Sequence, residues 1–284
     1  MIGDRATPGP EMDLSETGMS LGGLYVYPIK SCGGISLATA EVDERSIRHD
    51  RRWMLVDEHG VFLSQREIPR LALVRVGIGG DGLLLDAPGM PALDVPFAPK
   101  GEPVLARVWD DLAETLRVGD EADRWFSRFL GVPCRLVYLP DRSVRPVAPT
   151  YAKPGDRVGL SDGFPFLMIS EASLGDLNGR LDHPLPMERF RPSLVVRGCG
   201  PFAEDGWRRV RVGGINFRVV KPCARCKITT VDQTSAAVGK EPLRTLSRYR
   251  KVGSEVFFGQ NLIHDGTGVL NVGDAVEVIE LRPV

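Results

Sequence analysis

Glycine and proline divide this sequence into many short segments, and that pattern limits the folds it can form. Its 284 residues include 32 glycines and 22 prolines. Between them lie short runs rich in β-branched and aromatic residues, as at 24–27, 54–56 and 166–169, which predict strands joined by turns. Helical periodicity is confined to 120–130, 170–181 and 239–249. We therefore expect a mainly β protein with α additions, in the α+β class, with β-barrel architecture.

One glycine-rich segment imitates a nucleotide-binding motif. Residues 77–82, GIGGDG, satisfy the pattern G-x-G-x-x-G after a predicted strand. A dinucleotide site needs a helix to begin at the last glycine, whereas three leucines and then a turn follow here. The segment predicts a β-hairpin.

The chain is long enough for one large β domain or two of moderate size. Residues 141–159 are polar and contain several arginines, which is typical of a linker or of a mobile loop at an active site. The predicted division is a disordered tail at 1–20, a first domain at 21–140, a linker or loop at 141–156 and a second domain at 157–284. The tail is acidic and has no apolar core, so it is not a signal peptide.

Charge and cysteine content exclude several classes of protein. The formal net charge is −1, which gives no overall attraction to nucleic acid or to an anionic membrane. No run approaches the roughly 18 apolar residues of a membrane-spanning helix. Five cysteines are too few for a disulfide scaffold in a chain of this length, and an odd number leaves one unpaired. These features predict a cytoplasmic protein with reduced thiols.

The segment with the most reactive side chains is VVKPCARCKITTVD, at 219–232. It places Cys223 and Cys226 among Lys221, Arg225 and Lys227. Neighbouring cations favour the thiolate, which is the form of cysteine that attacks electrophiles and binds soft metals. Because β-prone residues flank the pair, we expect a basic turn between two strands.

Four interpretations of this cysteine pair are open. A zinc site needs about four ligands, but the other cysteines and the histidines are scattered. A thioredoxin-like pair would precede a helix, but β-prone residues follow. The pair could also be a buried core cysteine beside an incidental one, or a single metal-ligating thiolate. In an extended chain, residues three apart point to opposite faces, so under the last interpretation Cys223 would point away from the site.

Cationic residues also occur where three other predicted strands begin or end. Lys30 and Ser31 follow the first strand and precede two glycines, so their turn could expose amide groups and bind an anion. A basic surface turn explains the same pattern. Arg51 and Arg191 precede later strands, where arginines are usually solvated.

Several segments together resemble the MOSC family, which includes the mitochondrial amidoxime-reducing components. KPCARCKITTVD, followed by GKEPLRTLSRYR at 239–250, resembles the family signature, and FFGQN at 257–261 matches a further block. YPIKSCGGI, at 27–35, resembles the start of the N-terminal β-barrel domain found beside many MOSC domains. The resemblance implies two β-barrel-like domains, with a MOSC-type barrel preceding the MOSC domain.

The resemblance also implies a site for the molybdenum cofactor, molybdopterin. The second cysteine of the motif is the family's ligand to molybdenum, so Cys226 is the expected metal ligand and catalytic residue. RFRPS, at 189–193, has Ser193 where the family has asparagine, which could weaken or water-bridge one hydrogen bond. Glu204 or Asp205 could lie near the site. Gln65, Arg66 and Arg70 lie in another family segment. The expected cofactor contacts are Lys30, Ser31, Arg51, Gly163, Phe164, Arg191 and Ser193.

By resemblance, the protein is a molybdenum-dependent oxidoreductase that reduces N-hydroxylated small molecules, namely amidoximes, hydroxylamines or N-hydroxylated bases. No iron–sulfur cysteine cluster follows the cysteine motif, so we expect electrons from a separate ferredoxin-, flavin- or cytochrome-type protein. No nucleic acid or membrane partner is expected. The alternative is a non-catalytic molybdenum cofactor carrier or a sulfur-transfer module.

Overall fold

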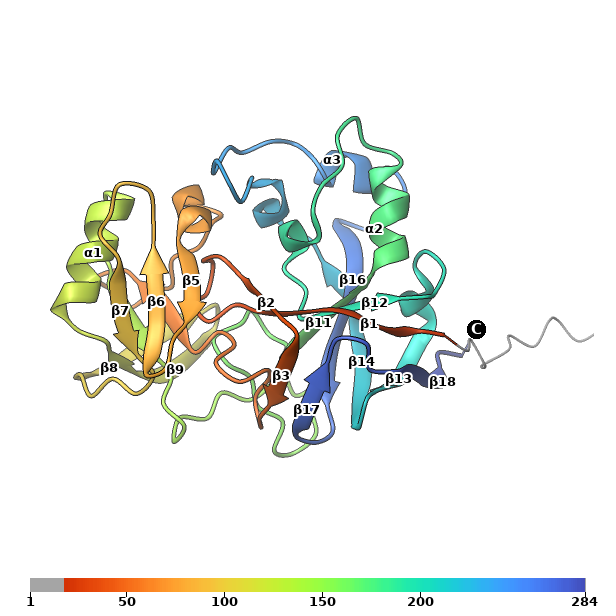
Figure 1. The fold of residues 1–284 in the computed structure, drawn as a ribbon, viewed down its shortest axis with the longest axis horizontal. Coiled ribbons are helices and arrows are strands. Elements are labelled where there is room, and N and C mark those ends of the chain that lie inside the picture. Colours follow the sequence, from red (N-terminus) through yellow and green to blue (C-terminus); the bar gives the residue numbers. More distant parts are fainter. Residues whose placement is uncertain (1–17, 284) are drawn as a thin grey trace, which may run out of the picture.

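The computed structural model describes residues 18–283, so the predicted disordered tail lies almost wholly outside the described residues. The prediction of a mainly β protein with few helices is confirmed (Figure 1). The strands are β1 (Ser20–Val26), β2 (Ile35–Leu37), β3 (Thr39–Val42), β4 (Trp53–Val56), β5 (Arg75–Ile78), β6 (Gly82–Asp86), β7 (Leu93–Pro96), β8 (Pro103–Val108), β9 (Asp111–Arg117), β10 (Arg135–Tyr138), β11 (Phe166–Ser170), β12 (Leu194–Arg197), β13 (Trp207–Val212), β14 (Ile215–Ala224), β15 (Lys251–Val252), β16 (Glu255–His264), β17 (Gly268–Asn271) and β18 (Val276–Leu281).

The helices are short, and none within residues 18–283 is long and apolar enough to cross a membrane. The α-helices are α1 (Asp120–Leu130), α2 (Glu171–Asn178) and α3 (Leu243–Leu246), and the 3₁₀ turns are η1 (Pro69–Leu73), η2 (Met187–Phe190), η3 (Ala203–Gly206) and η4 (Lys227–Thr230).

The strands form one large sheet and three smaller ones. The large sheet has the order β18-β13-β14-β16-β11-β12-β1-β2, with β15 paired to β16. The smaller sheets are β4-β10-β9-β8, β5-β6-β7 and β17-β3. Figure 1 shows α1 and β5 to β9 gathered on one side of the molecule and the large sheet on the other. Strands on either side of the predicted linker at 141–156 pair with each other, since β1 pairs with β12 and β3 pairs with β17.

One row of paired residues crosses the large sheet and positions the site. Lys221 of β14 pairs with Asn261 of β16, and Asn261 pairs with Leu167 of β11. The row continues where Ser193 N–H donates to the Leu167 carbonyl at 2.8 Å. Tyr25 N–H of β1 then donates to the Ser193 carbonyl at 3.0 Å. Segments far apart in the sequence are thereby held side by side by backbone hydrogen bonds.

Local sequence signals account for the ends of two helices. The α1 helix ends at Gly131, whose φ of +75° is in the left-handed region that favours glycine. Asp120 is the first residue of this helix and Gly119 precedes it, so Asp120 does not occupy the N-cap position. Ser170 caps α2, since its Oγ accepts from Ser173 N–H at 3.0 Å.

The glycine-rich segment forms a hairpin, as predicted. β5 and β6 pair antiparallel from Arg75 opposite Asp86 to Ile78 opposite Leu83. The predicted third helix is much shorter than the segment 239–249, because α3 spans four residues.

Glu204 supports the start of α2. Its side chain is 1% exposed, and its Oε1 accepts from Ser170 N–H at 3.0 Å and from Ser173 Oγ at 2.8 Å. Asp205 instead accepts from Arg250 and from Gln260, whose amide lies at 2.6 Å. Both carboxylates serve the packing around α2 and β16, and neither lines the cavity described below.

We predict that Glu204→Ala lowers the free energy of unfolding by about 1–3 kcal/mol, because it leaves buried donors without their acceptor. Denaturant unfolding of the purified protein measures the change. Glu171→Ala, at the exposed first residue of the same helix, is the matched control and should cost less than about 0.5 kcal/mol. Equal effects from the two variants would contradict this role for Glu204.

Candidate active site

The row of paired residues forms one wall of a cavity of about 330 Å³. Its other walls come from the turn after β1, the segment before β11, the end of η2 and the end of β14. All of the site residues predicted from the sequence line it, namely Lys30, Ser31, Arg51, Gly163, Phe164, Arg191, Ser193 and Cys226. The structure therefore brings the predicted set together, and their role as cofactor ligands stays a prediction.

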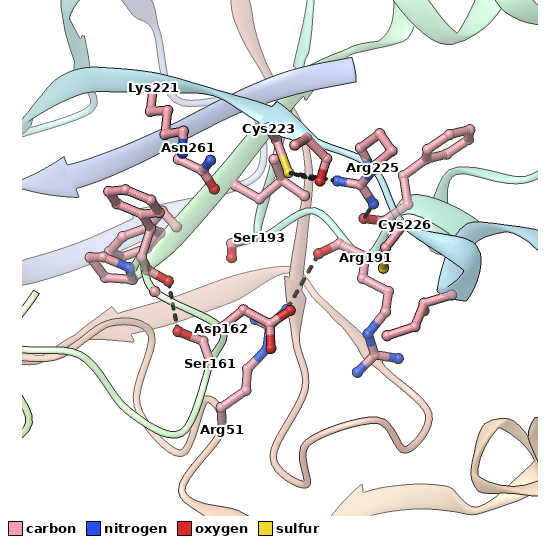
Figure 2. Close-up of a pocket in the computed structure, with 18 of the residues that line it drawn as sticks. Arg51, Ser161, Asp162, Arg191, Ser193, Lys221, Cys223, Arg225, Cys226 and Asn261 are labelled. Carbon is pink, nitrogen blue, oxygen red and sulfur yellow. Dashed lines mark hydrogen bonds between the residues drawn. The ribbon is translucent and has the colours of Figure 1, made fainter. Parts of the chain in front are cut away.

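Both cysteines of the C-x-x-C motif line this cavity (Figure 2). The expectation that Cys223 points away is wrong. The pairing of β14 with β16 shifts register between Pro222 and Ala224, and such a bulge breaks the alternation of side chains along a strand. Arg225 Nη1 donates to Cys223 Sγ at 3.0 Å, and its Nη2 donates to the Phe190 carbonyl at 2.6 Å. Arg225 thus holds the first thiol in the cavity wall.

Cys226 lies just beyond β14, at the residue that precedes η4. Within residues 18–283, no group of three or more histidine, cysteine, aspartate or glutamate side chains is placed to hold a metal ion. A metal bound by Cys226 would therefore take most of its ligands from a molecule other than this chain. That geometry suits a metal carried by a cofactor better than a zinc site built from side chains alone.

Two arginines stack on one aromatic ring beside the cavity. The guanidinium carbons of Arg51 and Arg191 each lie 4.3 Å from the centre of the Tyr27 ring, which is favourable for a cation and an aromatic face. Both residues have left-handed backbones, with φ of +46° and +58°. This conformation is uncommon for residues other than glycine and is often found at functional sites.

The two arginines are unequally neutralised. Arg51 Nη1 donates to both oxygens of the buried Asp50 at 2.6 and 2.7 Å. Arg191 Nη1 donates to the Cys32 carbonyl at 2.6 Å, and its charge faces the like charge of Arg51. Burial and then this neighbouring cation lower the pKa of Arg191 to about 10. A phosphate bound here would relieve that repulsion and accept the bidentate contacts that arginine favours.

Lys30 has a carboxylate partner that the sequence did not reveal. Its ammonium lies 2.5 Å from Asp162, which also accepts from Arg66 at 2.8 Å. Burial lowers the pKa of Lys30 to about 8, although Asp162 opposes the shift. Burial alone would raise the pKa of Asp162, but the charges of Lys30 and Arg66 outweigh it and hold that pKa well below its usual range. Asp162 is therefore ionised at neutral pH.

The three residues of the SQREIPRL segment have different roles. Gln65 is fully buried, and its amide donates to the Ser31 carbonyl at 2.6 Å, which fixes the turn that carries Lys30. Arg66 donates to Asp162 at 2.8 Å and lies close enough to Cys226 for the two side chains to interact. Arg70 stacks on Phe129 of α1 at 4.6 Å, away from the cavity.

Arg145 organises the segment before β11 and was missed in the sequence. Its side chain is buried, and Nη1 donates to the carbonyls of Gly159 at 2.9 Å and Ser161 at 2.6 Å. Asp111 at the start of β9 balances its charge at 2.8 Å. The predicted linker thus holds Asp162 and Gly163 in place. Only the excess of arginines in a polar stretch hinted at this role.

Ser193 supplies an unused polar atom inside the cavity. The residue is 1% exposed, and its Oγ has no hydrogen-bond partner among residues 18–283. Because buried hydroxyls are normally paired, this atom indicates where a bound molecule would make a polar contact.

Comparisons with known proteins match both halves of the chain. Residues 19–133 match the model of the MOSC N-terminal beta barrel domain and residues 155–277 match that of the MOSC domain. Mitochondrial amidoxime-reducing component 1 of Mus musculus is 36% identical, over 97% of this chain and 86% of the relative. The Homo sapiens component 1 is 34% identical over 97% and 87%. Component 2 of Bos taurus is 35% identical over 96% and 86%.

Among solved structures, a solution structure from Bordetella bronchiseptica aligns with a TM-score of 0.35 and 27% identity, covering 41% of this chain and 88% of the other.

The lowered pKa of Lys30 predicts a pH-dependent stability. Below pH 8 the lysine is protonated in both the folded and unfolded states. Between about pH 8 and 10.5 the unfolded chain binds more protons, so this residue makes stability rise with pH. From pH 8 to 10.5 the free energy of unfolding should therefore rise by roughly 1–3 kcal/mol less in Lys30→Met than in the wild-type protein. Lys153→Met, at a lysine that is 61% exposed, should leave this rise unchanged; an unchanged slope in Lys30→Met would contradict the assignment.

Proposed function

The chain belongs to the MOSC family, with an N-terminal MOSC β-barrel domain followed by a MOSC domain, and we propose that it is a molybdenum-dependent oxidoreductase that reduces N-hydroxylated compounds. Relatives that are 33–37% identical over most of this chain are named amidoxime-reducing components, and the reductive activity is carried over from those names as a proposal.

The observation that carries the proposal is the meeting of a thiol and three cations in one cavity. Cys226, Lys30, Arg51 and Arg191 come from four separate segments, and all line the same space. The molybdenum cofactor needs a soft donor for its metal and cations for its phosphate. The unpaired Ser193 Oγ adds a polar contact. These residues fit the cofactor.

In this proposal Cys226 binds the molybdenum, and Arg51 and Arg191 bind the phosphate end of the pterin. Lys30 and Ser31 lie on a turn fixed by Gln65 and contact the cofactor from the first half of the chain. Gly163, Phe164 and Ser193 contact it from the second half. When bound, the cofactor supplies a two-electron redox centre, and the chain supplies ligation, orientation and access for the substrate.

The proposed reaction breaks the N–O bond of a hydroxylamine, amidoxime or N-hydroxylated base. Two electrons and two protons convert the N–OH group into N–H and release one water. We propose that a separate ferredoxin-, flavin- or cytochrome-type protein delivers the electrons. We also propose a cytoplasmic location, where reducing conditions would keep both cavity thiols reduced.

One observation favours a second function. Cys223 is an additional thiol in the cavity, held by Arg225 at 3.0 Å, which would suit a protein that carries the cofactor or handles its sulfur without reducing substrates.

Turnover separates these two functions, and the cysteines test the ligand assignment. Protein reduced chemically and mixed with benzamidoxime should form benzamidine in proportion to its molybdenum content. Cys226→Ser should abolish this activity while pterin remains bound, because serine is a harder donor that is rarely ionised. Cys223→Ser should keep the molybdenum and most of the activity.

Cofactor retention without any turnover would favour the carrier. Equal loss of activity in both variants would show that the two thiols act as a unit, contrary to the assignment of Cys226 alone.

Phosphate binding by the arginine pair gives a further prediction. Arg191→Gln keeps a polar side chain but shortens it and removes its charge, and should weaken cofactor retention on the order of tenfold to a hundredfold. Pterin fluorescence and molybdenum content of the purified variant measure the loss, and circular dichroism checks the fold. Arg48→Ala, at an exposed arginine paired with Glu41, is the control. Full occupancy in Arg191→Gln would show that the phosphate binds elsewhere.

A further inference from the structure

One tryptophan differs from the other three in its surroundings. The chain has four, all within residues 18–283. Trp53, Trp125 and Trp207 are buried, whereas Trp109 is 47% exposed. Large exposed aromatic side chains are often involved in binding.

The backbone of Trp109 is also unusual. Val108 of β8 pairs with Asp111 of β9, so Trp109 and Asp110 form the turn of this hairpin. Trp109 has a φ of +56°, in the left-handed region that is unfavourable for a bulky residue. Such strain persists only where surrounding contacts hold it, and it is concentrated at functional sites.

The contacts that hold Trp109 lead directly to the active site. Its ring packs edge-on against Phe62, with centres 5.0 Å apart, and the Arg66 guanidinium lies 4.8 Å from its centre. We call Phe62, Arg66 and Trp109 the aromatic shelf. Lys30 lies 5.1 Å from the Phe62 ring centre, and Lys30 and Arg66 both bind Asp162. A closed ring of contacts beside the cavity thus runs through the aromatic shelf, Asp162 and Lys30.

Arg66 links the shelf to the proposed metal ligand. Besides binding Asp162, its guanidinium lies close enough to Cys226 for the two side chains to interact. Trp109 therefore stacks on a side chain that neighbours Cys226, although Trp109 does not line the cavity.

The size of the cavity requires the substrate to extend beyond it. Its volume of about 330 Å³ is near the lower limit for small-molecule sites, and in the proposed function the cofactor occupies that space. A substrate whose N-hydroxyl group reaches a metal held by Cys226 would have to extend beyond the cavity, and the shelf adjoins Cys226 through Arg66.

We propose that Trp109 is a stacking subsite for the planar, conjugated part of the substrate, such as the ring of an aromatic amidoxime or of an N-hydroxylated base. An exposed aromatic face stacks on conjugated rings with little regard to their substituents. Arg66 keeps the indole in place from one side. The inference rests on the proposed function and specifies the class of substrate that the site prefers.

Binding can be measured without turnover, because Trp109 is the exposed one of the four tryptophans. Benzamidine, the reduced form of benzamidoxime, should quench the intrinsic fluorescence of the full-length protein saturably. Cyclohexanecarboxamidine, which has the same amidine on a saturated ring, should do so only weakly. Trp109→Leu should lose the quenching and, by calorimetry, bind benzamidine roughly tenfold more weakly.

Two variants serve as controls. Leu112→Ala, an exposed apolar residue on the same hairpin, should leave binding unchanged. Trp109→Phe should retain most of the affinity, which keeps the test valid if Trp109→Leu does not fold. Equal affinity for the two amidines, or unchanged benzamidine binding in Trp109→Leu, would overturn the proposal.

Kinetics distinguish the subsite from the proposed function. Trp109→Leu should raise KM for benzamidoxime and leave kcat/KM for the small acetamidoxime unchanged. If wild-type protein reduces neither compound but still binds benzamidine through Trp109, the proposed function fails and the subsite stands. If Trp109→Leu slows turnover with a donor protein but not with a chemical reductant, the shelf contacts that protein, and the substrate subsite is refuted.

Discussion

The hydrogen-bonded row across β14, β16, β11 and the start of β12 is the constraint on which the site depends. It sets Lys221, Asn261, Leu167 and Ser193 side by side, and the pairing of β1 with β12 then brings the Lys30 turn to Arg191. Because a register slip of one residue would reverse every side chain, the sheet fixes which groups face the cavity. The thiol and the cations are thus positioned by strands and by the turns that adjoin them, with Lys30 and Cys226 after a strand and Arg51 and Arg191 before one.

The same cations that suit an anionic cofactor are a cost to the chain on its own. Arg191 is buried beside Arg51 with a carbonyl as its partner, whereas Lys30 has Asp162 and Arg51 has Asp50. Removing a charge from water is unfavourable unless it is paired. Burying Arg191 without a carboxylate partner therefore lowers the stability of the chain, and a bound anion would offset that cost. Such a trade of stability for binding is common at active sites.

The residues singled out in the sequence line one cavity, whereas several details of the fold had no signal in the sequence. Short β-prone runs predicted many of the strands. The motifs around Cys226, Lys30 and Arg191 named residues that line one cavity in the structure. Cys223 was placed wrongly because a bulge, set by pairing with a distant strand, is invisible in local alternation. Asp162 and Trp109 have no local signature, since their partners lie far away in the sequence. Glu204 lay in a family-like segment but serves packing.

The order in which strands pair bears on how the chain folds as it is synthesised. β1 is made first but pairs with β12, and β3 pairs with β17, more than 220 residues later. β1 lacks its partner β12, and β3 lacks its partner β17, until most of the chain has left the ribosome. Pairings of such long range close slowly and leave strand edges exposed meanwhile. The β4-β10-β9-β8 and β5-β6-β7 sheets, by contrast, consist of strands that are complete by residue 138. The nascent chain can therefore form these two sheets while β1 and β3 still wait for their partners.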